Sequence, residues 1–289
     1  MRTQSIPCEI ALQRIRELFD IRWGFVSPTK CTHIILDINS VFSTVCRLGD
    51  IASYGFETFV VEIKQMLQTF ISTNLTKKIV FVYTTDRTIS ATKMGPEYLK
   101  FYYEERPHYA DVIIKSFIEK LELVSQMTNV TTINCGEFEP SFIIWSYLVY
   151  YPETIVISRS KLVLQLISTN GYFWDGRFMY HKSLNPSKMV SEIDIKAKYK
   201  FPKILPFSLY PYYISMRGIP EHGYLGIPSY GEKRTINHIV ENIASIIEEK
   251  DEIFNYDLYK YTYPPSFLKD VVLKDEKLKE KYTEIKKQI

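Results

Sequence analysis

Residues 136–166, GEFEPSFIIWSYLVYYPETIVISRSKLVLQL, contain the pattern that decides the fold. The pattern predicts a helix, a short turn, a buried strand over residues 154–158 and a polar strand end that leads into another helix. In open α/β folds, ligands bind at the carboxyl ends of the strands. This strand end offers no acidic side chain there, because its residues are Arg159, Ser160, Lys161 and Leu162.

Two more short apolar runs, at residues 32–36 and 78–83, are predicted to form central strands. The amphipathic residues 56–71 between them predict a helix that covers the sheet. A strand, a helix and a strand in this order imply a right-handed crossover and a parallel pair. The two strands would therefore present Asp37 and Asp86 at one edge of the sheet.

The predicted fold class is α/β, with a central and mostly parallel sheet flanked by helices. We expect four parts: an N-terminal helical extension at residues 1–30, the α/β domain at 31–200, a helical subdomain at 201–250 and a helical tail at 251–289. Further predicted elements are helices over residues 9–19, 109–127 and 232–249, a strand over residues 130–134, and a hairpin that turns at Asp175 and Gly176.

The composition is that of a globular, intracellular protein. Of the 289 residues, 46% are hydrophobic and 24% are charged, so the chain can bury a substantial core. No apolar run approaches the roughly 18 residues needed to cross a bilayer, and the N-terminus lacks a signal-peptide pattern. The four cysteines show no zinc-ligand spacing, which indicates buried thiols of a reducing compartment. The net charge of +3 permits a nucleic-acid partner without requiring one.

Glycines gather in the predicted helical subdomain, at Gly218, Gly223, Gly226 and Gly231. Two short helices joined by a glycine-containing turn can aim backbone N–H groups at a phosphate. The same pattern also fits a plain turn between packed helices, and the glycines alone leave both interpretations open.

Three motifs stand in a fixed order along the chain. The first is ILDINS, which places Asp37 at a strand end and Asn39 and Ser40 in the loop after it. The second is SRSKLVLQL, and the third is GIPEHGYLGIPSYGEKRT, residues 218–235. Their order resembles that of the flap endonuclease and 5'-3' exonuclease superfamily, whose PIN-like nuclease domain is followed by a helix-hairpin-helix element. The resemblance implies this fold for residues 32–244.

The resemblance also implies where DNA would bind. In the family, a basic and tyrosine-rich segment follows the second acidic strand, and a glycine hairpin follows the sheet. The matching residues are Lys93, Lys100 and Arg106 in the segment, and Gly226, Gly231 and Lys233 in the hairpin.

Most of the family's acid positions hold other residues. Family members cut phosphodiesters with two divalent ions held by clustered carboxylates. Acids remain at Asp37, Asp86 and Glu139, whereas the matched positions without an acid are Ser141, Phe142, Ser160, Leu162, Ile219 and His222. A two-metal site is therefore not expected. We predict that the remaining acids act as caps and as ion-pair partners of Arg159 and Lys161, with no cofactor; a single Mg²⁺ held by the three acids is the alternative.

These residues support three hypotheses about function. The first is a catalytically degenerate 5' nuclease-like protein that serves as a non-catalytic DNA-binding or assembly subunit, with protein partners, in replication, repair or transcription. The second is a residual Mg²⁺-dependent 5'-3' exonuclease or flap endonuclease. The third is a structural interaction protein, which exposed apolar surface at Phe142 and Leu162 would favour. The composition suggests a viral source, and we expect an intracellular protein, in the cytoplasm or at viral or host DNA, that is neither secreted nor in a membrane.

Overall fold

The chain is described here by a computed structural model. The residues described are 8–21, 31–43, 56–84, 119, 129–135, 140–160, 163, 166, 171–174, 176, 179–180, 209–219, 224–256, 259, 280, 283 and 287. The helices and strands before residue 181 form one compact unit, and those after residue 208 form another.

A six-stranded sheet is the centre of the first unit. Its strands are β1 (His33–Asp37), β2 (Lys78–Tyr83), β3 (Val130–Asn134), β4 (Thr154–Ile157), β5 (Tyr172–Trp174) and β6 (Met179–Tyr180). They lie in the order β3-β2-β1-β4-β5-β6, and every neighbouring pair is parallel except β5 and β6. The predicted α/β class with a mostly parallel sheet is confirmed.

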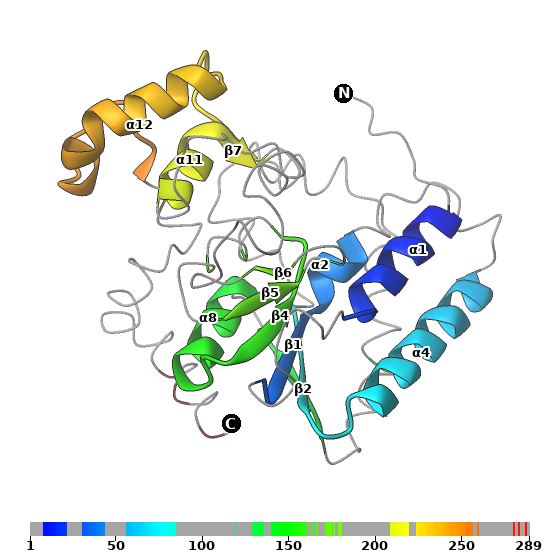
Figure 1. The fold of residues 1–289 in the computed structure, drawn as a ribbon. Helices are drawn as coiled ribbons and strands as arrows, with labels where there is room; N and C mark the ends of the chain where they lie inside the picture. The colour runs from blue at the N-terminus through cyan, green and yellow to red at the C-terminus, as the bar shows by residue number, and fades with distance from the viewer. Residues whose placement is uncertain are drawn as a thin grey trace. The chain divides into compact units, whose positions relative to one another are not determined.

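Helices cover both faces of this sheet. Figure 1 shows α8 (Pro140–Tyr150) on one side of the strands, and α1 (Cys8–Phe19) and α4 (Phe56–Thr73) on the other. The central strands are consequently buried on both faces, and Ile34, Leu36 and Val156 are fully buried. Burial on both faces explains why these strands are continuous apolar runs in the sequence.

The N-terminal helix packs onto the first unit. The indole Nε1 of Trp174 donates a hydrogen bond of 3.1 Å to the carbonyl oxygen of Leu18, and the rings of Phe19 and Phe70 lie 5.4 Å apart. Between β5 and β6, Gly176 has a φ of 93°, in the left-handed region that favours glycine. The predicted turn around Gly176 therefore joins the two antiparallel strands.

The strand order changes direction beside β1. From β1 the chain adds β2 and then β3 on one side, and it returns to place β4 on the other side of β1. In open α/β sheets, this switch point opens a crevice at the carboxyl ends of the strands. Asp37 ends β1, and Ser158 follows β4, so these two residues lie at the switch point.

The described residues of the second unit include two helices and a short ladder. Helix α11 (Tyr210–Arg217) is followed by the antiparallel strands β7 (Gly218–Ile219) and β8 (Tyr224–Leu225), and then by α12 (Glu232–Ile247). The ladder is a departure from the prediction of short helices alone. It begins at Gly218, whose φ of 70° ends α11 and turns the chain into an extended course.

The helices and strands described above do not test every prediction made from the sequence. The four-part division of the chain stays a prediction, and the helix expected over residues 109–127 falls outside the described residues. Cys31 and Cys135 are buried thiols. Within the described ranges, no helix combines the length and the apolar character needed to cross a membrane.

Candidate functional site

The carboxylate of Asp37 is the central group at the carboxyl edge of the sheet. The residue is 2% exposed. Its Oδ1 accepts a hydrogen bond of 3.1 Å from the backbone N–H of Ser40, and its Oδ2 accepts one of 2.8 Å from the hydroxyl of Ser158. The first bond is a helix cap, and the second joins the ends of β1 and β4 across the switch point.

The prediction of a loop for Asn39 and Ser40 is wrong. Both residues lie in the short helix α2 (Ile38–Ser43), which starts directly after Asp37. The helix can begin there because an Asp side chain at the N-cap satisfies a backbone N–H of the first turn. The predicted role of Asp37 as a cap is thus observed, whereas its predicted ion pairs with Arg159 and Lys161 stay a prediction.

Further hydrogen bonds reinforce the same edge. The hydroxyl of Ser40 accepts a bond of 2.6 Å from the backbone N–H of Arg159, and the hydroxyl of Ser158 accepts one of 3.0 Å from the N–H of Ser160. The amide of Asn39 bonds both the N–H and the carbonyl of Thr84, at 2.8 and 3.0 Å. The ends of β1, β2 and β4 are therefore connected by neutral side chains around one carboxylate.

Two positions without acids lie at the start of α8. Ser141 is 2% exposed, and its hydroxyl has no hydrogen-bond partner in the part of the chain that the structure describes. Phe142 is fully buried, with its ring stacked on Trp145 at 6.4 Å. Phe142 therefore adds to the core and provides no exposed apolar surface. Pro140 begins the helix, as expected for a residue that has no N–H to leave unpaired.

Other predicted site residues can be placed only in part. Ser160 follows β4 and is half-buried, and the backbone of Ile219 pairs with Tyr224 in the small ladder. The residues outside the described part of the chain are Asp86, Lys93, Lys100, Arg106, Glu139, Lys161, Leu162 and His222.

Of the three retained acids that could contribute to a two-metal centre, the described residues include Asp37. Such a centre needs clustered carboxylates, because magnesium ions take hard oxygen ligands in octahedral geometry. Among the described residues, no group of three or more His, Cys, Asp or Glu side chains is placed to hold a metal ion. Among the described residues, the groups that bond to Asp37 or to its partners include the hydroxyls of Ser40 and Ser158 and the backbone N–H groups of Arg159 and Ser160.

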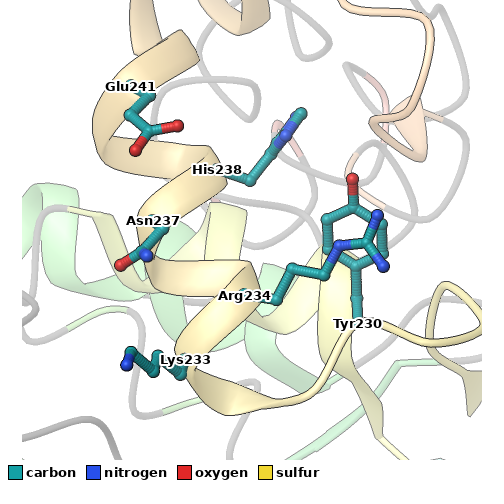
Figure 2. Close-up of a pocket in the computed structure, with 6 residues that line it drawn as sticks. All are labelled: Tyr230, Lys233, Arg234, Asn237, His238 and Glu241. Atoms are coloured by element: carbon teal, nitrogen blue, oxygen red, sulfur yellow. The ribbon is translucent and has the colours of Figure 1, made fainter.

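The second unit contains the other predicted DNA-binding residues that the structure describes, which are Gly226, Gly231 and Lys233. A Cβ atom on Gly226 would lie 2.3 Å from the carbonyl oxygen of Arg217, so only glycine allows this approach of two backbone segments. Gly231 is the N-cap of α12, and a Cβ there would meet nothing within 4 Å. Lys233 is exposed on the first turn of α12 and lines a hollow in the surface (Figure 2).

The other side chains that line this hollow were not predicted from the sequence. Arg234 lies over the ring of Tyr230, with the guanidinium carbon 4.4 Å from the ring centroid. His238 meets the same ring edge-on, at 5.5 Å. The available signal was the spacing of Arg234 and His238, because residues four apart in a helix lie on the same face. Tyr230 precedes the helix.

Comparisons with known proteins concern the fold of the chain. No protein-family model and no curated protein matches the chain. Among solved structures, T5 5'-exonuclease with bound zinc ions gives a TM-score of 0.58 at 15% identity, covering 88% of this chain and 98% of that one. A bacteriophage T5 flap endonuclease in a pseudo-enzyme–product complex with DNA and metal ions gives 0.53 at 15% identity, with the same coverages.

The strand order and flanking helices define an α/β protein whose topological switch point lies between β1 and β4. The structural matches refine this class. The chain has a flap endonuclease or 5'-3' exonuclease-like fold, as the sequence resemblance implied.

Proposed function

We propose that the chain is a catalytically degenerate 5' nuclease-like protein. It acts as a non-catalytic DNA-binding or assembly subunit of a replication, repair or transcription complex, in an intracellular and viral setting. The observation behind this proposal is the hydrogen bond between Asp37 and Ser158. The Asp37 carboxylate is 2% exposed and accepts hydrogen bonds from protein groups through both oxygens. It therefore serves as a structural element of the fold.

The residues near this bond support the same conclusion. Active relatives need several carboxylates at this edge to hold two cations. This chain has Ser141, Phe142 and Ser160 at positions where the family resemblance implies acids. Ser141 and Phe142 are buried, and the N–H of Ser160 donates a hydrogen bond to the hydroxyl of Ser158, which supports a structural role for these positions.

DNA binding is proposed for the second unit. Its two helices, with Gly226 at a close backbone approach and Gly231 at the start of α12, are consistent with a helix-hairpin-helix-like element. Lys233 is exposed beside this turn. The T5 flap endonuclease match is a complex with DNA, which supports DNA as the partner here.

A mobility-shift assay with branched and duplex DNA tests the binding role. We expect binding at micromolar protein that weakens as salt rises, because phosphate contacts release counterions. Lys233→Ala should lower the affinity and reduce the salt slope by about one. The matched control is Lys250→Ala, an exposed lysine after the same helix that pairs with Glu248. Wild-type protein that binds neither DNA would overturn the DNA-binding role.

A residual nuclease is the second candidate, and the retained acid at Asp37 favours it. In that case a single Mg²⁺ would be held by Asp37, Asp86 and Glu139. Flap and 5'-overhang substrates with Mg²⁺ or Mn²⁺ decide between the two functions. The degenerate protein should cleave neither substrate above background; cleavage that Asp37→Ala abolishes would establish the enzyme instead.

A structural interaction protein is the third candidate. Val240 and Ile247 on α12 are 60% and 63% exposed, which is surface that a protein partner could cover. Purification of the tagged chain from its native host would test this role. A fixed partner at constant stoichiometry, together with no DNA binding by the isolated chain, would favour it over the DNA-binding role.

A further inference from the structure

The surface of α12 carries a hollow that the proposed function does not yet use. Its volume is about 420 Å³. The side chains that line it come from the residue before Gly231 and from the first three turns of the helix (Figure 2). They are Tyr230, Lys233, Arg234, Asn237, His238 and Glu241.

A flat platform stands in this hollow. The guanidinium carbon of Arg234 lies 4.4 Å from the centroid of the Tyr230 ring, and Figure 2 shows the Arg234 side chain lying across that ring. Tyr230 is 8% exposed, whereas Arg234 is exposed. A guanidinium stacks on an aromatic face through its own flat face. Tyr230 and Arg234 both line the hollow, so the pair forms part of its wall.

The platform is held rigidly by contacts behind it. His238 meets the Tyr230 ring edge-on at an interplanar angle of 89°, and its Nε2 lies 3.0 Å from Oδ2 of Asp251. The other oxygen of Asp251 accepts hydrogen bonds from two backbone N–H groups, those of Ile253 and Phe254. The carbonyl of Tyr230 also accepts a bond of 2.6 Å from Arg217. The ring is therefore fixed before any ligand arrives, and this lowers the entropic cost of binding.

The chemistry of the lining points to a nucleotide. Nucleic-acid bases stack on the planes of Arg and aromatic side chains. Lys233 precedes Arg234 and offers an ammonium group for a phosphate. Asn237 and Glu241 offer amide and carboxylate groups that can bond to the edge of a base.

We propose that this hollow binds one unpaired nucleotide of a DNA strand, with its base stacked on the Arg234 and Tyr230 pair and its phosphate near Lys233. The inference rests on the proposed DNA-binding function and specifies the form of DNA, which is one with a single-stranded or displaced nucleotide. A free deoxynucleotide has the same chemistry, so the test includes it as a separate ligand.

Oligonucleotides with one 2-aminopurine base test the inference, because the fluorescence of this base is quenched when it stacks. Three ligands are compared: a single strand, a fully paired duplex of the same sequence and 2-aminopurine deoxynucleoside monophosphate. We expect wild-type protein to quench the single strand and to bind it with higher affinity than it binds the duplex. Quenching only by the free nucleotide, with none in the strand, would overturn the DNA assignment.

The decisive variant is Arg234→Lys, which keeps the charge and removes the flat group. It should weaken single-strand binding by roughly ten-fold and abolish quenching, with duplex binding and the salt slope unchanged. Arg16→Lys on α1 makes the same chemical change at an exposed site outside the second unit and should have no effect. Thermal melting of both variants checks that they fold, as expected for exposed side chains.

The outcomes separate the two proposals. If wild-type protein binds duplex and single strand equally and Arg234→Lys behaves like wild type, the hollow is not a nucleotide site, while the DNA-binding function stands. If wild-type protein binds no DNA in any form, both the function and the inference fail.

Discussion

The hydroxyl of Ser158 donates a hydrogen bond of 2.8 Å to the carboxylate of Asp37, across 121 positions of the sequence. The bond joins the ends of two neighbouring parallel strands at the point where the strand order reverses. In open α/β folds this is where a ligand binds. In this chain a hydrogen bond between two side chains occupies part of that ligand-binding position.

Ser158→Ala should destabilise the first unit. The substitution leaves a carboxylate that is 2% exposed without one of its hydrogen-bond donors. Hydrogen bonds to charged groups contribute about 1.5–3 kcal/mol, so we expect the free energy of unfolding to fall by about that amount. Urea unfolding followed by circular dichroism measures it. Ser72→Ala on α4, an exposed serine, is the matched control and should change stability by less than about 0.5 kcal/mol.

The effect of a substitution at Ser141 on stability should depend strongly on the charge of the new side chain. Its buried hydroxyl has no partner among the described residues, so Ser141→Ala removes no hydrogen bond there and should change the free energy of unfolding by less than about 0.5 kcal/mol. Ser141→Asp would put a carboxylate in the same buried position, and we expect a loss of about 3 kcal/mol or more. Unfolding curves with and without Mg²⁺ provide the measurement. Recovery of Ser141→Asp by Mg²⁺ would contradict the proposal that this edge has lost its metal-binding role.

Substitution by alanine at two glycines of the second unit should destabilise that unit by very different amounts. In Gly226→Ala the new Cβ would lie 2.3 Å from a backbone oxygen that cannot move alone, so we expect a loss of about 3 kcal/mol or more. In Gly231→Ala the new atom meets open space at a φ of −68°, and the loss should stay below about 1 kcal/mol. Limited proteolysis and thermal melting compare the two variants. Equal losses would show that the close backbone approach at Gly226 does not limit stability.

Acidification should destabilise the fold through His33. Its ring packs on Tyr151 at 4.1 Å, and burial, followed by the nearby Lys78 cation, lowers the pKa of His33 below its usual 6.5. The unfolded chain then binds the proton more readily than the folded chain. The stability contributed by neutral His33 is therefore present above the unfolded pKa and is lost as the pH falls through the folded pKa.

His33→Phe keeps a ring at this position and removes the titration. Melting temperatures at about pH 7.5 and about pH 5.5 should fall less between the two values for this variant than for wild type. For each protein we compare the change in melting temperature between the two pH values. A change in stability that is the same at both pH values therefore does not affect the result. An identical pH dependence in the two proteins would contradict the role of His33.

Much of the fold could be predicted because its signals are local. The central strands are apolar runs that are buried on both faces, and α4 has a helical apolar stripe, so their positions follow from the side chains themselves. Asp37 at the tip of β1 is also a local feature. The helix that begins after it was missed, because its cap forms only when the Asp37 side chain turns back to Ser40.

The candidate site could be predicted only in part. The missing acids at Ser141 and Ser160 can be recognised in the sequence through the family motifs. That Phe142 is buried, and therefore offers no docking surface, depends on how α8 packs against the sheet. The Tyr230 and Arg234 platform could not be predicted, because an aromatic residue four positions before a basic one is common, and the two form a platform only when their side chains meet in space.

The sequence by itself determined the α/β class, the places of the central strands and the absence of most acids from the family positions. These properties depend on residue type and periodicity, and both can be read from residues that are close together in the sequence. The tertiary structure alone decided that Ser158 bonds to Asp37, because a hydrogen bond between residues 121 positions apart requires that the sheet first bring two strand ends together. It also decided that α12 carries a hollow, because a concave surface depends on the directions of side chains in space.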